Sequence, residues 1–154
     1  MLRHIYRIVF IRWHGLLRLR PATAPVRLEC LGAECGKCCN LMGGEVVVTP
    51  SEAPLLSKHL VQISQSTSVI EGNGCTCSLL VNGLCSKYDS RPKGCREYPW
   101  YNVNGALYYD AGCPGIKYDY DDRPKISTIT SIENYYGILP KTIRRVVIKL
   151  MNVW

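Results

Sequence analysis

Residues 75–99 read CTCSLLVNGLCSKYDSRPKGCREYP and carry four of the nine cysteines of this 154-residue chain. The other five lie on either side of this stretch, at Cys30, Cys35, Cys38, Cys39 and Cys113. Glycine, proline and charged residues surround these positions, which is typical of loops that fold tightly rather than of an apolar core face. The sequence therefore predicts a small fold that its cysteines organise.

Composition separates thiolate ligands from disulfides. Phe occurs once while Tyr occurs ten times and Cys nine times, so the core needs support from cross-links or metal. The cysteine count is odd, and the opening stretch MLRHIYRIVFIRW has no signal-peptide pattern because Arg7 and Arg12 interrupt it. No run of apolar residues is long enough to span a membrane. We therefore expect a reducing compartment, the cytoplasm or an organellar matrix, and no secretion.

Charge divides the chain into three segments. Residues 1–27 hold six Arg and no acidic residue, and residues 140–154 hold four basic residues and no acidic one. All twelve Asp and Glu therefore fall in residues 28–139, although the whole chain carries a formal charge of +7. The predicted organisation is a basic N-terminal helix with a proline linker (1–27), a cysteine-rich metal-binding domain (28–139) and a basic C-terminal helix (140–154).

Both terminal segments show helical spacing of apolar residues. In the first, the apolar set is Leu2, Ile5, Tyr6, Val9, Trp13, Leu16 and Leu17. In the second, it is Ile143, Val146, Val147, Leu150, Met151 and Trp154. Such a helix docks on its own domain, lies on a membrane surface, binds a protein or RNA partner, or acts as a targeting segment. Pro21 and Pro25 end the first helix and predict a short extended linker.

The middle of the chain predicts short elements of mixed type. Residues 46–48 and 106–109 read as strands, the second after an Asn-Gly turn, and residues 68–70 as a weaker strand. Residues 49–52 form a capping box that predicts a helix over residues 50–61. The expected fold is a small irregular α+β domain, with loops around the metal centre or centres and a helix at each end.

The spacing of Cys35, Cys38 and Cys39 is that of metal ligands. Two cysteines separated by two residues can bind one zinc ion or one iron–sulfur cluster. Because the Cβ atoms of neighbouring residues diverge, we expect Cys38 and Cys39 to serve different centres, or one of them to be no ligand. Arg91 and Arg96 either compensate the negative charge of the thiolates or pair with carboxylates.

These blocks resemble the CxxCxxCC (YkgJ-like) family of zinc- or iron-chelating domains over roughly residues 28–116. The most distinctive element is RP-x-x-CR-x-YP at residues 91–99. The resemblance implies eight metal ligands: Cys30, Cys35, Cys38, Cys39, Cys77, Cys85, Cys95 and Cys113. Cys75 is extra to the pattern. Eight thiolates allow two four-thiolate centres or one centre with spare thiols, and the cofactor is zinc or iron, including one or two 4Fe-4S clusters.

The expected function is that of a non-catalytic metal-binding protein. Its basic terminal helices would dock on a protein or ribonucleoprotein partner or on a membrane surface. Two alternatives remain: an iron–sulfur redox protein or enzyme, and an RNA- or ribosome-associated factor that uses the basic ends. No acid–base pair stands out, and His4, His14 and His59 lie outside the cysteine blocks, so no catalytic residue is predicted.

Overall fold

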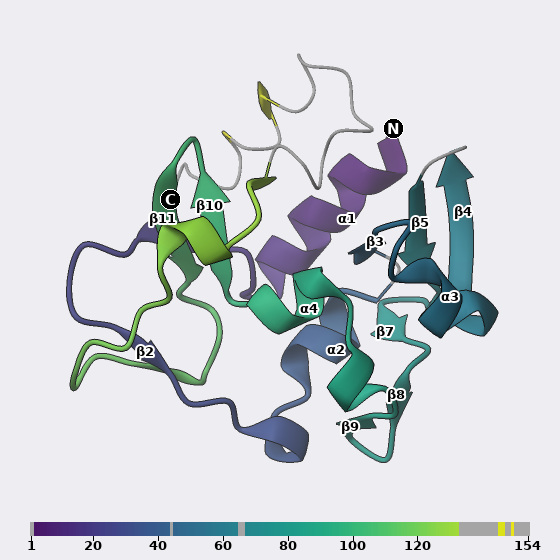
Figure 1. Ribbon diagram of the computed structural model, residues 1–154, viewed down its shortest axis with the longest axis horizontal. Helices are drawn as coiled ribbons and strands as arrows, with labels where there is room; N and C mark the ends of the chain where they lie inside the picture. The colour runs from purple at the N-terminus through teal and green to yellow at the C-terminus, as the bar shows by residue number, and fades with distance from the viewer. Residues whose placement is uncertain (1, 44, 65–66, 133–144, 147–148, 150–154) are drawn as a thin grey trace. The chain divides into compact units, whose positions relative to one another are not determined.

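The computed structural model describes residues 2–43, 45–64, 67–132, 145–146 and 149 (Figure 1). The chain forms two compact units. Unit 1 comprises Met1–Cys30 and Glu97–Trp154, and unit 2 comprises Leu31–Arg96. Unit 1 is thus assembled from both ends of the chain, whereas unit 2 is one continuous stretch. The segment boundaries expected at residues 27 and 139 do not coincide with these units and stay a prediction from composition.

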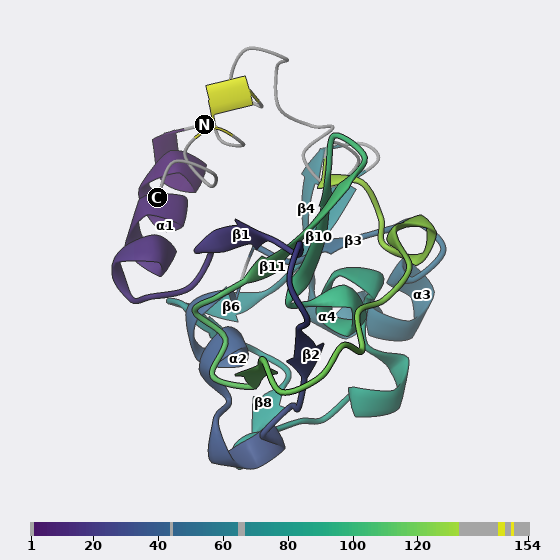
Figure 2. The ribbon, with the colours of Figure 1, turned by 90° about the vertical axis from the view of Figure 1, so that its left-hand side faces the viewer.

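Unit 1 contains one long helix and an antiparallel sheet. Its elements are α1 (Leu2–Trp13), β1 (Leu19–Pro21), β2 (Arg27–Leu28), β10 (Trp100–Val103), β11 (Ala106–Asp110), β12 (Ile116–Lys117) and the short helix η4 (Ile126–Thr128). The sheet has the order β1-β11-β10 (Figure 2), and β2 pairs with β12 in a second, two-stranded sheet. The linker predicted around Pro21 is therefore extended, as expected, and pairs as strand β1.

One hydrophobic core of unit 1 is formed by residues that are far apart in the sequence. It consists of Ala22, Val26, Trp100, Tyr109, Ile116 and Ile129. Asp110 is fully buried nearby, and its carboxylate accepts backbone hydrogen bonds from Leu17 (2.6 Å), Arg18 (2.9 Å) and Gly112 (2.9 Å). Because a buried carboxylate is costly without such donors, these bonds join the chain after α1 to the end of β11.

Unit 2 is made of short elements. Its strands are β3 (Val47–Val48), β4 (Leu60–Ser64), β5 (Thr67–Ile70), β6 (Gly72–Asn73), β7 (Thr76–Cys77), β8 (Leu80–Val81) and β9 (Leu84–Cys85). Its helices are η1 (Gly32–Glu34), α2 (Lys37–Leu41), α3 (Ala53–Leu56), η2 (Ser57–His59), η3 (Tyr88–Ser90) and α4 (Lys93–Glu97). The strands form a sheet of order β3-β5-β4 and the hairpins β6–β7 and β8–β9. The predicted α+β class, with short strands and helices, is confirmed.

Two predicted elements differ from the structure in length. The helix expected over residues 50–61 stops early, because Val61 pairs with Val69 and belongs to strand β4. The first helix ends at Trp13, since Gly15 (φ 87°) and Leu17 (φ 55°) adopt left-handed backbone conformations. The helix expected from residue 140 falls largely outside the described residues. None of the described helices has the length and apolar character needed to cross a membrane.

Candidate metal centre

Helix α2 carries two of the predicted ligands side by side. The helix begins after Gly36, whose φ of 51° is a conformation that glycine adopts at little cost. The Cys39 thiol donates a hydrogen bond to the sulfur of Cys38, and this bond lowers the pKa of Cys38 to about 7 although burial raises it. The same bond raises the pKa of Cys39. The Cys38 and Cys39 thiols therefore interact with each other, and the expectation that they serve different centres, or that one of them is no ligand, stays a prediction.

A close backbone approach brings α2 to strand β7. The N–H of Gly43 donates to the carbonyl oxygen of Cys75 at 2.8 Å. A Cβ at Gly43 would overlap the backbone of Thr76 and Cys77, so only glycine allows this contact. The approach places Cys38 and Cys39 within electrostatic range of the buried Cys77.

Further thiols gather in the hydrophobic core of unit 2. That core consists of Val48, Leu56, Ile70, Cys77 and Leu79, and the partly buried Cys39, Cys85 and Cys95 pack against it. Burial raises the pKa of Cys95 to about 12, and the charges of Cys77, Cys38 and Cys85 add to the increase. Burial also raises the pKa of Cys77, and Cys85 and Cys38 add to that shift. We call Cys38, Cys39, Cys77, Cys85 and Cys95 the thiol cluster.

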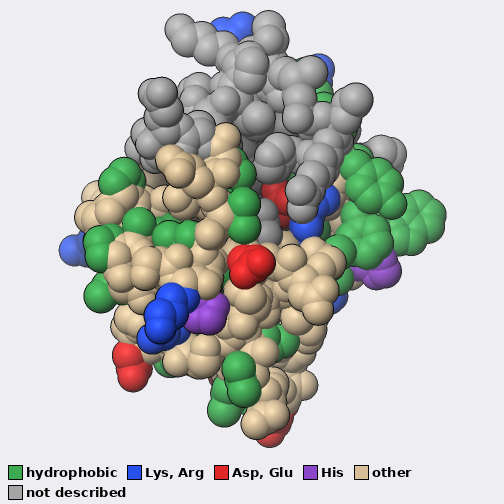
Figure 3. Space-filling view, turned by 90° about the vertical axis from the view of Figure 1, so that its right-hand side faces the viewer, with side chains coloured by type: hydrophobic (Ala, Val, Ile, Leu, Met, Phe, Trp, Pro, Cys, Tyr) green, Lys and Arg blue, Asp and Glu red, His purple; other side chains and the backbone are tan. Residues whose placement is uncertain are grey.

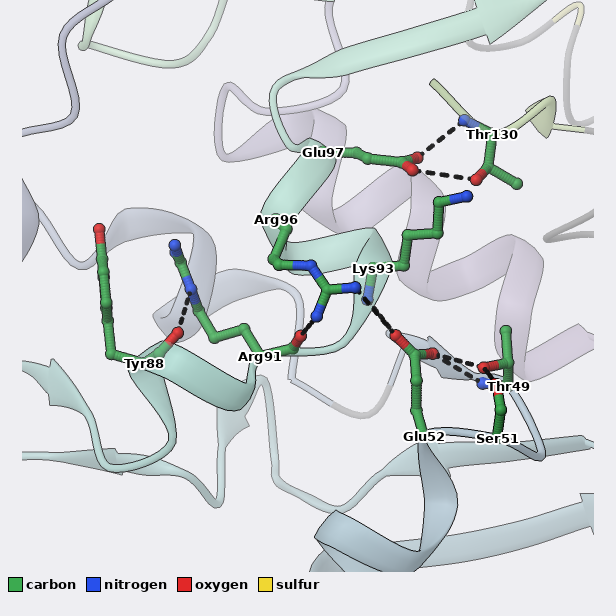
Figure 4. Close-up of polar contacts among 9 residues, drawn as sticks. All are labelled: Thr49, Ser51, Glu52, Tyr88, Arg91, Lys93, Arg96, Glu97 and Thr130. Carbon is green, nitrogen blue, oxygen red and sulfur yellow. Dashed lines mark hydrogen bonds and ion pairs between the residues drawn. The ribbon is translucent and has the colours of Figure 1, made fainter. Parts of the chain in front are cut away.

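Helix α4 brings Cys95 to the cluster, and Glu52 holds the start of that helix (Figure 4). The Glu52 carboxylate accepts a hydrogen bond from the N–H of Lys93 at 2.6 Å. It also accepts bonds from the N–H and the hydroxyl of Thr49, at 3.1 and 2.7 Å, so the Glu52 half of the predicted capping box forms, although α3 begins after Glu52 rather than after Thr49. The carboxylate thus joins the segment after β3 to a helix that bears a thiol. The capping pattern reveals the first contact in the sequence, but nothing there indicates the second.

The two arginines of this region have different partners. Arg91 lies over the ring of Tyr88, 3.8 Å from its centroid, and donates to the carbonyl oxygen of Tyr88 at 3.0 Å. The charge of Arg91 lowers the pKa of both Cys38 and Cys95. At Cys95, burial and the neighbouring thiols raise the pKa by more than Arg91 lowers it. Arg96 instead forms an ion pair with Glu52 at 3.6 Å and donates to the carbonyl oxygen of Arg91. Arg91 therefore fits the charge-compensating interpretation and Arg96 the carboxylate-paired one.

Four cysteines are not members of the thiol cluster. Cys35 and Cys75 belong to unit 2, before α2 and β7, and the interactions described above for the cluster do not include their side chains. Cys30 and Cys113 belong to unit 1, on adjacent segments. There the N–H of Glu29 donates to the carbonyl oxygen of Gly115 at 2.8 Å, and Cys113 begins the tight turn that leads to Ile116. Of the eight predicted ligands, the structure gathers five in unit 2, whereas Cys30 and Cys113 belong to unit 1 and Cys35 is not among the five.

The chemistry of the cluster fits a thiophilic metal, although the thiols do not already surround one point. Among the described residues, no group of three or more Cys, His, Asp or Glu side chains converges on a position that could hold a metal ion. Five thiols in one small core nevertheless provide the four soft ligands that zinc or an iron–sulfur cluster takes. Binding requires these side chains to rotate and to lose their thiol protons.

Comparison with known proteins agrees with this chemistry. A family model named CxxCxxCC, with the description "Putative zinc- or iron-chelating domain", matches residues 29–114. This stretch contains all nine cysteines and covers more than half of the chain. Searches of the curated proteins and of the solved structures found no match to this chain. The resemblance inferred from the cysteine spacing is confirmed: the chain belongs to the CxxCxxCC family of zinc- or iron-chelating domains.

Proposed function

We propose that this chain is a non-catalytic metal-binding protein whose metal centre lies in unit 2. The observation that carries the proposal is the thiol cluster, in which Cys77 is part of the hydrophobic core and Cys39, Cys85 and Cys95 pack against it. Four of the five clustered thiolates would hold the metal. The bound ion or cluster would supply cross-links between segments that are far apart in the sequence.

Magnitudes support a structural role for the metal. A structural zinc site contributes about 10–16 kcal/mol in small metal-dependent domains. The net stability of a whole domain is only about 5–15 kcal/mol. Because unit 2 has short strands and a small apolar core, ligation would supply a large share of its stability. The positive charge of Arg91 near Cys38 and Cys95 would offset part of the negative charge of a four-thiolate centre.

The test is metal analysis of protein purified without air, together with its absorption spectrum. A colourless protein with stoichiometric zinc identifies a zinc site, and a brown protein with iron and sulfide identifies an iron–sulfur cluster. Either result supports the proposal. Protein that contains neither metal, and that binds none when zinc or iron and sulfide are supplied anaerobically, contradicts it.

Cysteine variants locate the site. We expect Cys95→Ser to lose most of the bound metal and Cys75→Ser, the matched control, to keep it, because only Cys95 belongs to the cluster. The double variant Cys30→Ser/Cys113→Ser should keep the metal of unit 2, and any metal that it loses measures a second centre in unit 1. Equal loss of metal in Cys75→Ser and Cys95→Ser would contradict the placement of the centre. Cys38→Ser is a second cluster variant for the case in which Cys95→Ser does not fold.

The role of the basic ends stays a prediction. No contact among the described residues supports the protein or ribonucleoprotein partner that their charge predicts. None supports the redox alternative for an iron–sulfur centre either. The exposed face of α1 bears on the third expected partner, a membrane surface.

A further inference from the structure

Helix α1 exposes several apolar side chains of the stripe that its helical spacing indicates. Trp13 is 85% exposed, Tyr6 71% and Val9 51%. The helix buries Ile8 and Ile11 instead, neither of which belongs to that stripe. Apolar side chains also protrude beside a histidine at the right-hand edge of the space-filling view (Figure 3). Large exposed apolar groups on successive turns of one helix indicate a surface that contacts another apolar medium.

Basic residues lie next to and after this face in the chain. Arg12 lies beside Trp13 in the chain, and its guanidinium donates to the carbonyl oxygen of Leu17 at 3.2 Å, so it is held at the end of the helix. Burial lowers the pKa of Arg12, and the nearby charge of Arg18 lowers it further, which shows that the two cations lie close together. Arg18 is itself exposed.

A buried carboxylate offsets part of this charge. Residues 1–27 contain no acidic residue. The carboxylate that acts on Arg12 is Asp110, which is fully buried and bonded to backbone N–H groups. The exposed Arg18 still presents a positive charge at the end of α1, which complements an anionic surface.

We propose that the face formed by Tyr6, Val9 and Trp13, together with the exposed guanidinium group of Arg18, binds the surface of a membrane that contains anionic lipids. Trp and Tyr have an apolar body and a polar tip, so they settle at the level of the lipid headgroups, where arginine meets lipid phosphates. Single-stranded RNA is the less suitable partner, because Val9 lies between the aromatic residues and provides no stacking surface. The contact is peripheral and does not depend on the metal of unit 2.

The experiment is sedimentation of the intact, metal-loaded protein with vesicles of phosphatidylcholine, with and without phosphatidylserine. We expect binding to the mixed vesicles to exceed binding to phosphatidylcholine alone by on the order of tenfold and to weaken with salt. Trp13→Ser should lower binding by a similar factor, and Arg18→Gln should reduce mainly its salt-sensitive part. Leu55→Ser is the matched control, because Leu55 is 64% exposed but lies on α3 of unit 2.

Several results would overturn the proposal. They include no binding of the unchanged protein to the mixed vesicles, equal binding by Trp13→Ser, and an equal loss in Leu55→Ser. Circular dichroism of each variant must match that of the unchanged protein, and Tyr6→Ser replaces Trp13→Ser if it does not. If Trp13→Ser abolishes binding to single-stranded RNA or splits a dimer, and vesicles do not bind, the face serves RNA or a second copy of the chain instead.

Discussion

The carboxylate of Glu52 accepts a hydrogen bond from the backbone N–H of Lys93 at 2.6 Å, across 41 positions of sequence. Lys93 is the first residue of α4, and Cys95 lies within that helix. The same carboxylate binds the N–H and hydroxyl of Thr49 (Figure 4). One side chain thus fixes the segment after strand β3 and the helix that presents a thiol.

Removing the Glu52 carboxylate should loosen both segments. We expect Glu52→Ala to lower the free energy of unfolding by about 2–3 kcal/mol, because it leaves the donors of Thr49 and Lys93 without this acceptor. Glu52→Gln should cost less, since the amide keeps one acceptor oxygen. The ion pair with the half-exposed Arg96 adds little to either value. Urea unfolding of the metal-loaded protein measures the changes, and Ser51→Ala, a nearby exposed position, should stay close to the unchanged protein.

Glu52 also predicts part of the acid sensitivity. Burial raises the pKa of its carboxyl, but the hydrogen bonds from Thr49 and Lys93 and the charge of Arg96 outweigh burial and lower it from 4.5. A carboxyl whose pKa is lower in the folded state stabilises the fold above its unfolded pKa. That contribution is lost as the pH falls through the folded pKa. Unfolding measured from pH 6 downwards should therefore show a decline below about pH 4.5 that is smaller in Glu52→Gln. An identical decline in both proteins would contradict this role.

Gly43 should tolerate no side chain. A Cβ there would overlap the backbone of Thr76 and Cys77, so Gly43→Ala must push α2 away from β7. We expect a loss of about 1–3 kcal/mol in unfolding free energy and weaker metal binding, because Cys38 and Cys39 move away from Cys77. The control is Gly74→Ala, where an added Cβ would meet no atom within 4 Å apart from its chain neighbours. Only the backbone φ of 62° is unfavourable there. A competition titration with a metal chelator compares the two, and equal affinity would contradict the prediction.

Asp110 should be the most sensitive polar residue of unit 1. Asp110→Asn places an amide where a fully buried carboxylate accepts bonds from Leu17, Arg18 and Gly112, so one acceptor site is lost. We expect a loss of about 1–3 kcal/mol in thermal unfolding experiments. Asp119→Asn, at an exposed ion pair with Arg27, should change stability by less than about 1 kcal/mol. Comparable effects at the two positions would show that burial of Asp110 does not matter.

Removal of the metal should act mainly on unit 2. The thiol cluster packs in the core of that unit, whereas the core of unit 1 contains Trp100, Tyr109 and other apolar residues, and Cys113 is the one cysteine among the described residues packed against it. Hydrogen exchange with and without a chelator should therefore show loss of protection in β5 and β7 and retention in β10 and β11. Protection that falls equally in all four strands would mean that the metal stabilises the whole chain.

Local patterns of the sequence predict local structure well. The predicted bond from the N–H of Thr49 to the Glu52 carboxylate forms, and the strands expected at residues 46–48, 68–70 and 106–109 are observed as β3, β5 and β11. These features depend on hydrogen bonds and side-chain shapes within a few residues. The helix expected over residues 50–61 fails for the opposite reason, because pairing of β4 with β5 outweighs the local helix signal.

Tertiary choices were harder to predict. Helical spacing identifies α1 but not the face that it buries, since the helix has apolar residues on several sides and packs through Ile8 and Ile11. Family resemblance supplies eight candidate ligands, yet the grouping of Cys38 and Cys39 with Cys77 depends on a backbone contact at Gly43. The interaction of Glu52 with Lys93 has no sequence signal, because the donor is a backbone N–H.

The division of the chain has a consequence for biosynthesis. Unit 2 is continuous and precedes strands β10 and β11 of unit 1 in the chain, so it is synthesised in full before them. Domains generally fold during synthesis in the order in which they emerge. The nascent chain can therefore capture its metal early, and shortage of that metal would strand an intermediate whose thiols are open to oxidation before the protein is finished.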